Sequence, residues 1–234
     1  MIYWLMQTQA EMPETERYLA EYLGEAEREK LALLRVDKRR RDWLLGRWTA
    51  KRLLQRVIWE ASKVTVSLDL ITIDNNADGV PFFQSSVSNL QCSISISHGH
   101  GRAFAAAVVK PDWPLGADLE LVAPRPAGFV RDYFTEAEAE LVQRVNGAGR
   151  DRLVTAVWSA KEAVLKALCL GLSVDTRAVS CLLEVGEGGT AGWRPFAIHL
   201  DKARLPRPSP DLAGWWRADG DFVLTLAAKN YEEI

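Results

Sequence analysis

The sequence has few cysteines and no long apolar run. Its three cysteines show no paired spacing, so they predict neither a disulfide framework nor a zinc site. No segment reaches the roughly 18 uninterrupted apolar residues of a membrane-spanning helix. The apolar start, Met1–Met6, is too short for a secretory signal and lacks a positively charged segment before it. We therefore expect an unprocessed, soluble, cytoplasmic protein with reduced thiols.

The charge is almost balanced. The 29 basic and 31 acidic residues give a formal net charge of −2. No overall field would therefore attract nucleic acid or an anionic membrane, and we expect neither as a partner. The 234 residues, 48% of them hydrophobic, are ample for a buried core.

The first half of the sequence predicts a strand, then helices, then a group of short strands. Apolar residues at helical spacing and short alternating runs favour these elements. The helices are expected at 14–22, 26–35 and 38–59, and the strands at 1–6, 71–73, 81–83, 93–97 and 103–109. Pro111, Trp113 and Pro114 then interrupt the pattern, and we place the boundary between two domains, 1–112 and 113–234, at this point.

The second half contains a similar mixture of elements. Helices are expected at 129–133, 136–145 and 152–170. Strands are expected in the segment that leads into Asp118 and Glu120 and at 179–185, 193–200, 214–217 and 222–227. Thr135–Glu138 has the form of a capping box, which favours a structural role for Glu138 over a catalytic one. The two halves predict an α+β fold of two similar lobes, each a small, mainly antiparallel sheet packed with helices. Their sequences alone do not prove a duplication.

Two acidic motifs carry the clearest chemistry: Gly116-Ala117-Asp118-Leu119-Glu120 and Trp158-Ser159-Ala160-Lys161-Glu162-Ala163-Val164-Leu165-Lys166. Asp118 and Glu120 share one face of a strand, and Glu162 and Lys166 share one face of a helix. Three carboxylates suit Mg²⁺ bound to a phosphate-bearing substrate. The alternatives are a solvated strand face and a surface ion pair between Glu162 and Lys166. The apolar surroundings of Glu162 favour a functional carboxylate, because buried carboxylates need a partner or a metal.

Two further segments could bind a phosphate. The strand that ends in Ser97 and His98 is followed by glycines, which permit close approach of the backbone to a ligand, and His98 can donate a hydrogen bond. The run Lys38–Arg41, followed by Arg47, could clamp a phosphate through charge-assisted hydrogen bonds. The alternatives are an exposed or structural histidine and the solvated face of an amphipathic helix.

In order and spacing, these motifs resemble those of the 4′-phosphopantetheinyl transferase superfamily, in its longer, single-chain, surfactin-synthetase-activating type. The resemblance covers about residues 27–172 and depends chiefly on the two acidic motifs. Ser95–His98, Asp78–Pro81 and Leu44–Arg47 are weaker matches. The resemblance implies two lobes related by a pseudo-two-fold axis, with a metal site at the interface between them.

The resemblance also implies an activity. Such an enzyme transfers the 4′-phosphopantetheine group of coenzyme A to a serine of an apo acyl or peptidyl carrier protein and releases adenosine 3′,5′-bisphosphate. Asp118, Glu120 and Glu162 would bind Mg²⁺, or Mn²⁺, with the pyrophosphate. Glu162 would accept the serine proton, directly or through a water, and Lys166 would balance charge or protonate the leaving group. We expect a monomer that serves fatty acid, polyketide or nonribosomal peptide biosynthesis.

By the same resemblance, a further set of residues would contact coenzyme A. The implied residues are Lys30, Arg40, Arg41, Arg47, Gly79, Pro81, Ser97, His98 and Lys161. Val80 departs from the pattern, because many relatives have a basic residue there, and Arg102 or Lys51 could supply a phosphate contact in its place. The carrier would dock on an exposed apolar patch with a few basic neighbours, with the helix at 136–145 as one wall.

Two other functions stay open on the sequence. A Mg²⁺-dependent phosphohydrolase acting on coenzyme A or a nucleotide would use the same metal set. A non-catalytic module could bind coenzyme A or a carrier without chemistry. The complete set of Asp118, Glu120, Glu162 and Lys166 favours the transferase, because a mere binder has less need of it.

Overall fold

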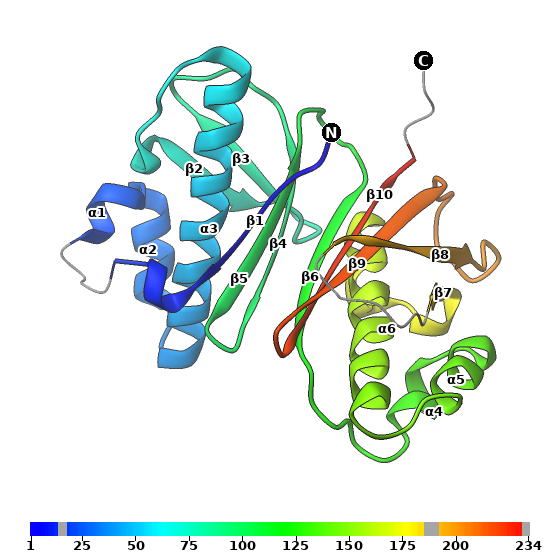
Figure 1. The fold of residues 1–234 in the computed structure, drawn as a ribbon. Coiled ribbons are helices and arrows are strands. Elements are labelled where there is room, and N and C mark those ends of the chain that lie inside the picture. The colour runs from blue at the N-terminus through cyan, green and yellow to red at the C-terminus, as the bar shows by residue number, and fades with distance from the viewer. Residues whose placement is uncertain (14–17, 185–191, 231–234) are drawn as a thin grey trace. The chain divides into compact units, whose positions relative to one another are not determined.

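The chain forms two compact units, Met1–Trp113 and Pro114–Ile234. The structure is a computed structural model and describes residues 1–13, 18–184 and 192–230. In each unit a sheet packs against one long helix (Figure 1). No helix in these described ranges is long and apolar enough to cross a membrane.

The first unit is built around helix α3 (Asp37–Ser62), which packs on a three-stranded antiparallel sheet. Its strands, in spatial order, are β1 (Tyr3–Thr8), β5 (Arg102–Val108) and β4 (Ser93–Gly99). A separate hairpin and two short helices complete the unit: β2 (Ile71–Asn75), β3 (Pro81–Ser85), α1 (Leu19–Tyr22) and α2 (Glu25–Leu33). The central strand β5 is rich in alanine and buried from Ala103 to Val108, so α3 can approach it closely.

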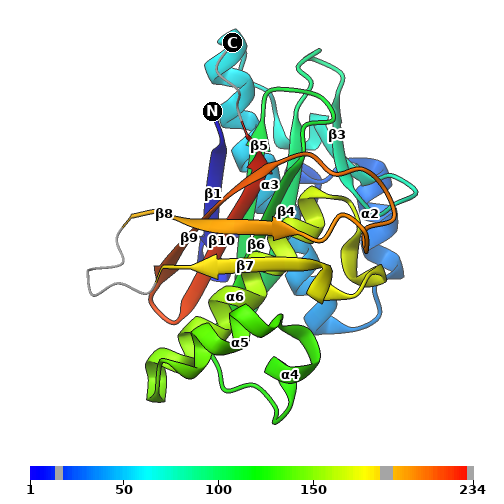
Figure 2. The ribbon, with the colours of Figure 1, turned by 90° about the vertical axis from the view of Figure 1, so that its right-hand side faces the viewer.

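The second unit has one five-stranded antiparallel sheet that packs against helix α6 (Gly147–Ala167). The strands, in spatial order, are β6 (Leu115–Leu121), β10 (Phe222–Lys229), β9 (Leu212–Asp219), β8 (Arg194–Leu200) and β7 (Val179–Leu183). Two shorter helices precede α6: α4 (Phe129–Tyr133) and α5 (Glu136–Gln143). Figure 2 shows β8 and β7 continuing the sheet beyond β9. Apolar residues of α6 and of the sheet form the main core of this unit.

Both units follow the same order of elements: a strand, helices that end in a long one, and two antiparallel hairpins. In each unit the first strand pairs with the last, β1 with β5 and β6 with β10. The units differ in the first hairpin, because β2 and β3 form a sheet of their own whereas β7 and β8 join the main sheet. The predicted α+β fold of two antiparallel sheets packed with helices is confirmed.

Most element bounds differ little from the predicted ones, and the differences have local causes. Helix α6 begins at Gly147, before the predicted start, because its first turn lacks the apolar periodicity used to find helices. Strand β9 is longer than predicted, and its residues alternate between buried and partly exposed along its length. Of the helix predicted at 14–22, residues 14–17 lie outside the described residues and the remainder contains α1.

Candidate functional site

Strand β6 positions the first pair of predicted metal ligands. Asp118 is buried and stands directly opposite Thr225 of β10, whereas Glu120 is partly exposed and stands opposite Val223. The carboxylate of Glu120 accepts a hydrogen bond from Arg125 over 2.8 Å. The guanidinium of Arg125 lies 5.4 Å from the centre of the Phe129 ring. Glu120 is therefore one half of an ion pair at the edge of the site.

Helix α6 lies unusually close to β6 at Gly116. A Cβ atom at this position would lie 1.8 Å from the carbonyl oxygen of Ala163. Only glycine permits this approach. Because Ala163 follows Glu162, the contact brings the part of α6 that contains Glu162 close to β6, the strand that contains Asp118 and Glu120.

Asp118 and Lys166 form the central contact of the site. Lys166 Nζ donates to Asp118 Oδ1 over 2.7 Å and to the carbonyl oxygen of Ala117 over 3.1 Å. Ser159 Oγ donates to the other oxygen, Asp118 Oδ2, over 2.8 Å. Among the described residues, the hydrogen bonds of Lys166 thus go to Asp118 and Ala117, and not to Glu162 as in the alternative of a surface ion pair.

Glu162 is electrostatically coupled to this cluster. Burial raises the pKa of Glu162 to about 7, and the negative charges of Asp118 and Glu120 act in the same direction against the opposing effect of Lys166. A carboxyl group with a pKa near neutrality can change its protonation state at physiological pH. Glu162 thus feels the charges of two further carboxyl groups and one ammonium group.

Lys161, predicted to contact coenzyme A, has a structural position instead. Its side chain is fully buried, and Nζ lies 2.7 Å from the Glu138 carboxylate. It also donates to the carbonyl oxygens of Thr176 and Val179. A buried ammonium with three internal acceptors cannot reach a ligand, so Lys161 is removed from the coenzyme A set. Glu138 also closes the predicted capping box with Thr135, which is confirmed.

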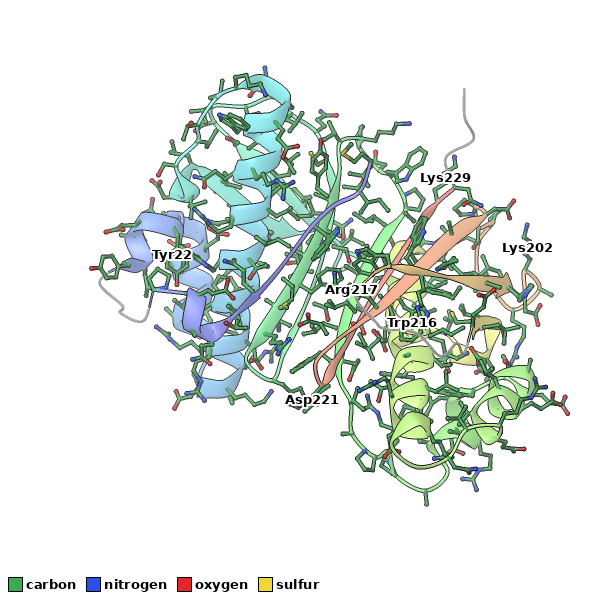
Figure 3. The ribbon with its side chains drawn as sticks, viewed as in Figure 1. Tyr22, Lys202, Trp216, Arg217, Asp221 and Lys229 are labelled. Atoms are coloured by element: carbon green, nitrogen blue, oxygen red, sulfur yellow. The ribbon has the colours of Figure 1, made fainter. Side chains whose placement is uncertain are left out.

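The first unit has a buried pair of the same kind. Lys51 is fully buried, and its Nζ contacts the carboxylate of Glu27 and the carbonyl oxygens of Tyr22 and Leu68. Tyr22, labelled in Figure 3, is the last residue of α1. Burial lowers the pKa of Lys51, and Glu27 opposes this shift. Lys51 therefore cannot stand in for the basic residue that Val80 replaces.

Arg47 is the most buried of the predicted arginines. Its Nη2 donates to Asn75 Oδ1 over 3.2 Å, and its Nε lies 3.8 Å from Glu27. The side-chain amide of Asn75 in turn donates to the carbonyl oxygen of Gly79 over 2.7 Å. Gly79 has a positive φ of 79°, which favours glycine in this turn. The structure thus joins Arg47 to the predicted glycine segment through one asparagine.

The other predicted basic residues of the first unit do not share a common contact partner. Lys30 forms an ion pair with Asp74, and Arg40 donates to the carbonyl oxygen of Leu31 over 3.2 Å. Arg41 is exposed on α3. These positions leave Arg41 accessible to an anion, whereas Lys30 would have to exchange its partner.

Ser97 and His98 lie near the end of β4, and Pro81 begins β3. Ser97 is buried and His98 is exposed. The ring of His98 packs on α3, since a Cβ atom at Gly46 would lie 2.6 Å from His98 Cδ2. Gly46 therefore makes room for the imidazole, which fixes its position while leaving it exposed.

Comparison with known proteins identifies the second unit. Residues 114–223 match the model of the 4′-phosphopantetheinyl transferase superfamily. The second unit is a domain of this superfamily. The match contains Asp118, Glu120, Glu162 and Lys166, and it begins where the second unit begins.

The superfamily domain also aligns with curated and solved relatives. The holo-[acyl-carrier-protein] synthase of Lactococcus lactis subsp. lactis is 27% identical over 106 residues, which are 45% of this chain and 89% of that protein. The solved synthase of Bacillus anthracis, in complex with coenzyme A (3′,5′-ADP), is 23% identical, with a TM-score of 0.40 over 47% of this chain and 95% of that one. The Helicobacter pylori synthase, in complex with coenzyme A, is 22% identical, with a TM-score of 0.38 over 47% of this chain and 100% of that one. The chain is a distant homologue of the holo-[acyl-carrier-protein] synthases.

The carboxylates of the superfamily domain are chemically suited to Mg²⁺, but their side chains are not arranged around a common metal position. In the ranges that the structure describes, no group of three or more histidine, cysteine, aspartate or glutamate side chains is placed to hold a metal ion. Lys166 holds one oxygen of Asp118, and Arg125 holds one oxygen of Glu120. Carboxylate oxygens are nevertheless the ligands that Mg²⁺ prefers, and Asp118 and Glu120 both act electrostatically on Glu162. An ion that bound either of these two oxygens would compete with a cationic side chain.

Sequence reasoning gave no role to four residues that shape the site: Gly116, Arg125, Ser159 and Thr225. Gly116 and Ser159 stood inside the quoted motifs without a function. Thr225 is a polar residue within the otherwise apolar run 222–228, and such an interruption is a usable indication. Nothing in the local sequence pairs Arg125 with Glu120, because that contact depends on the path of the loop after β6.

Proposed function

We propose that this chain transfers the 4′-phosphopantetheine group of coenzyme A to a serine of an apo carrier protein, as a longer, single-chain member of the superfamily. The observation that carries the proposal is the half-buried Glu162, with a pKa raised to about 7, beside Asp118, Glu120 and Lys166 in the matched domain. The relatives named as holo-[acyl-carrier-protein] synthases support the substrate class.

In the proposed reaction, the serine oxygen of the carrier bonds to the coenzyme A phosphorus that bears the pantetheine arm. The bond from that phosphorus to the bridging oxygen breaks and releases adenosine 3′,5′-bisphosphate. The serine proton passes to Glu162, whose pKa suits proton transfer near neutral pH. Lys166 neutralises charge on the departing bisphosphate. When bound by Asp118, Glu120 and Glu162, Mg²⁺ would supply charge stabilisation at the pyrophosphate.

We further propose that residues of the first unit bind the rest of coenzyme A. The proposed residues are Lys30, Arg40, Arg41, Arg47, Gly79, Pro81, Ser97 and His98. The hydrogen bonds that join Arg47, Asn75 and Gly79 support a shared role for Arg47 and the glycine turn in anion binding. The exposed imidazole of His98 supports a phosphate contact.

The single-chain, two-lobe type is supported by the repeated order of elements and by the two buried lysine–glutamate pairs. Glu27 is the third residue of α2 and binds Lys51 of α3, as Glu138 is the third residue of α5 and binds Lys161 of α6. A chain that contains both lobes would act as a monomer. The carrier could belong to fatty acid, polyketide or nonribosomal peptide biosynthesis.

A carrier-labelling assay tests the function. Purified chain, Mg²⁺ and coenzyme A are incubated with a panel of apo acyl and peptidyl carriers, and mass spectrometry records the addition of one phosphopantetheine group. A carrier whose modified serine is replaced by alanine is the matched control and should gain no mass. Asp118→Ala should abolish the addition to every carrier. No mass gain on any carrier would contradict the proposal, and bisphosphate release without a carrier would favour a phosphohydrolase.

A further inference from the structure

Two buried hydroxyl groups lie behind Asp118. Ser159 of α6 and Thr225 of β10 are both fully buried. Ser159 Oγ donates to Asp118 Oδ2 over 2.8 Å, and Thr225 Oγ1 lies 2.8 Å from both the Oγ and the carbonyl oxygen of Ser159. Ser159 gives its one hydroxyl proton to Asp118, so Thr225 is the donor toward Ser159, with its single proton shared between the Oγ and the carbonyl oxygen of Ser159. The hydroxyls form a directed chain from β10 through α6 to Asp118.

This pair of hydroxyls holds one oxygen of Asp118 and leaves the other to a more exposed partner. Thr225 stands directly opposite Asp118 in the pairing of β6 with β10, so backbone hydrogen bonds set their spacing. Asp118 Oδ2 is held by the buried Ser159, whereas Oδ1 is held by Lys166, whose side chain is 30% exposed. A cation that displaced the ammonium of Lys166 would meet Oδ1 already in position.

We propose that Ser159 and Thr225 are positioning residues that orient the Asp118 carboxylate for a divalent cation, a role that depends on the metal site of the proposed function. A ligand held by hydrogen bonds loses less conformational freedom when it binds a metal. The hydroxyl of Ser159 also limits which oxygen of Asp118 the cation can use.

The first unit shows that its scaffold does not require such a chain. Thr49 corresponds to Ser159, because each lies two residues before the buried lysine of its long helix, Lys51 or Lys161. Thr49 is also fully buried. In the described part of the protein, its Oγ1 has no hydrogen-bond partner. A hydroxyl at this helical position therefore does not by itself stabilise the long helix through a hydrogen bond.

The strand positions differ in the same way. Counted from the positive-φ glycine of the preceding turn, Ala106 of β5 corresponds to Thr225 of β10. Their partners across the strands are Trp4 and Asp118, respectively. Ala106, which faces no carboxylate, has no hydroxyl, whereas Thr225, which faces Asp118, has one. This difference supports a role for the Thr225 hydroxyl in holding Asp118 and not in stabilising the sheet.

Binding of Mn²⁺ to the whole chain, followed by electron paramagnetic resonance, tests this role. Ser159→Ala and Thr225→Val should each raise the dissociation constant about tenfold, and Thr225→Ser, which keeps the hydroxyl, should restore tight binding. Because Thr225 acts through Ser159, adding Thr225→Val to Ser159→Ala should cause no further loss. Thr155→Val is the matched control, because Thr155 is a fully buried threonine of α6 whose Oγ1 has no partner among the described residues. It should leave Mn²⁺ binding unchanged.

The outcomes separate the positioning role from the function. If Asp118→Ala weakens binding while Ser159→Ala and Thr225→Val do not, the positioning role is wrong and the metal site stands. If Asp118→Ala binds as tightly as the unaltered chain, the metal site of the proposed function is wrong. Additive losses in the double variant, or an equal loss in Thr155→Val, would also overturn the role. In carrier labelling, the KM for Mg²⁺ should rise while kcat at saturating Mg²⁺ stays close to its original value, a split that general loss of folding would not give.

Discussion

The two units contain the same buried pair but place different chemistry beside it. In the first unit Glu27 holds Lys51, and in the second Glu138 holds Lys161. In both, the glutamate also accepts a hydrogen bond from a backbone N–H of the strand that follows the long helix. Each pair therefore ties together a short helix, the long helix and the first hairpin of its unit.

The residue after each lysine shows where the units diverge. It is Arg52 in the first unit, which is exposed and bonded to a neighbouring glutamine, and Glu162 in the second. The facing strands differ in parallel, with Trp4 of β1 at the position that Asp118 has in β6. The next position on the helix lies outside the buried pair, so the same scaffold can carry either a guanidinium or a carboxylate.

The largest expected effect separates Glu162 from Arg52. Glu162→Gln removes the proposed proton acceptor with little change in volume, and the rate of carrier labelling should fall about 100- to 10,000-fold. Arg52→Gln is the matched change in the first unit and should leave the rate within about twofold, because surface substitutions rarely matter. Initial rates at saturating coenzyme A and Mg²⁺ measure both. Equal losses in the two variants would show that the units do not divide the work in this way.

The next effect tests what the units share. Lys161→Met and Lys51→Met each leave a buried carboxylate without its cation, and each should lower the free energy of unfolding by about 3–5 kcal/mol. Urea unfolding followed by circular dichroism measures the loss. Lys202→Met is the control, because Lys202 is exposed and 3.8 Å from Asp211, and it should change stability by less than about 0.5 kcal/mol. A large loss in only one unit would mean that the two pairs are not equivalent.

The sequence predicted the elements well, and it singled out the acidic residues, because both leave local patterns. Alternation and helical spacing reveal strands and helices, and Asp118 and Glu162 are carboxylates in apolar surroundings. Lys161 was misassigned because it and Lys166 look alike in one helix. The position of Glu138 in the folded structure gives Lys161 a structural role, whereas Lys166 contacts Asp118 at the site.

The contacts of Thr225 and Arg125 could not be predicted for a related reason. Thr225 reaches Asp118 only through the pairing of β10 with β6, which joins segments far apart in the sequence. Arg125 reaches Glu120 through a loop with no regular pattern. Long-range register and loop path are set by the whole core, and a local window does not contain them.

A smaller effect is expected at the contact between α6 and β6. Gly116→Ala places a methyl group against the backbone of Ala163, and the helix must shift, at a cost of about 1–3 kcal/mol. The shift also moves Glu162, so carrier labelling should fall together with the urea midpoint. Gly192→Ala adds the same methyl group in the same unit where no atom of the described residues lies within 4 Å, and it should change neither. Unchanged activity in Gly116→Ala would mean that the close contact does not position the site.

The smallest effect is a pH dependence of stability that should come from Glu162 in the second unit and not from Arg52, its counterpart in the first unit. The pKa of Glu162 is raised to about 7 in the folded chain, above its ordinary value near 4.5, so the folded state binds this proton more tightly than the unfolded state. Its contribution is therefore present below about pH 4.5 and is lost as the pH rises toward 7. Because the side chain is partly exposed and faces Asp118, Glu120 and Lys166, the change should stay below about 1 kcal/mol. Urea unfolding without metal at pH 5 and pH 8 measures this loss of stability. The loss should appear in the original chain and in Arg52→Gln, but not in Glu162→Gln. A loss that persists in Glu162→Gln would assign the titration to another group.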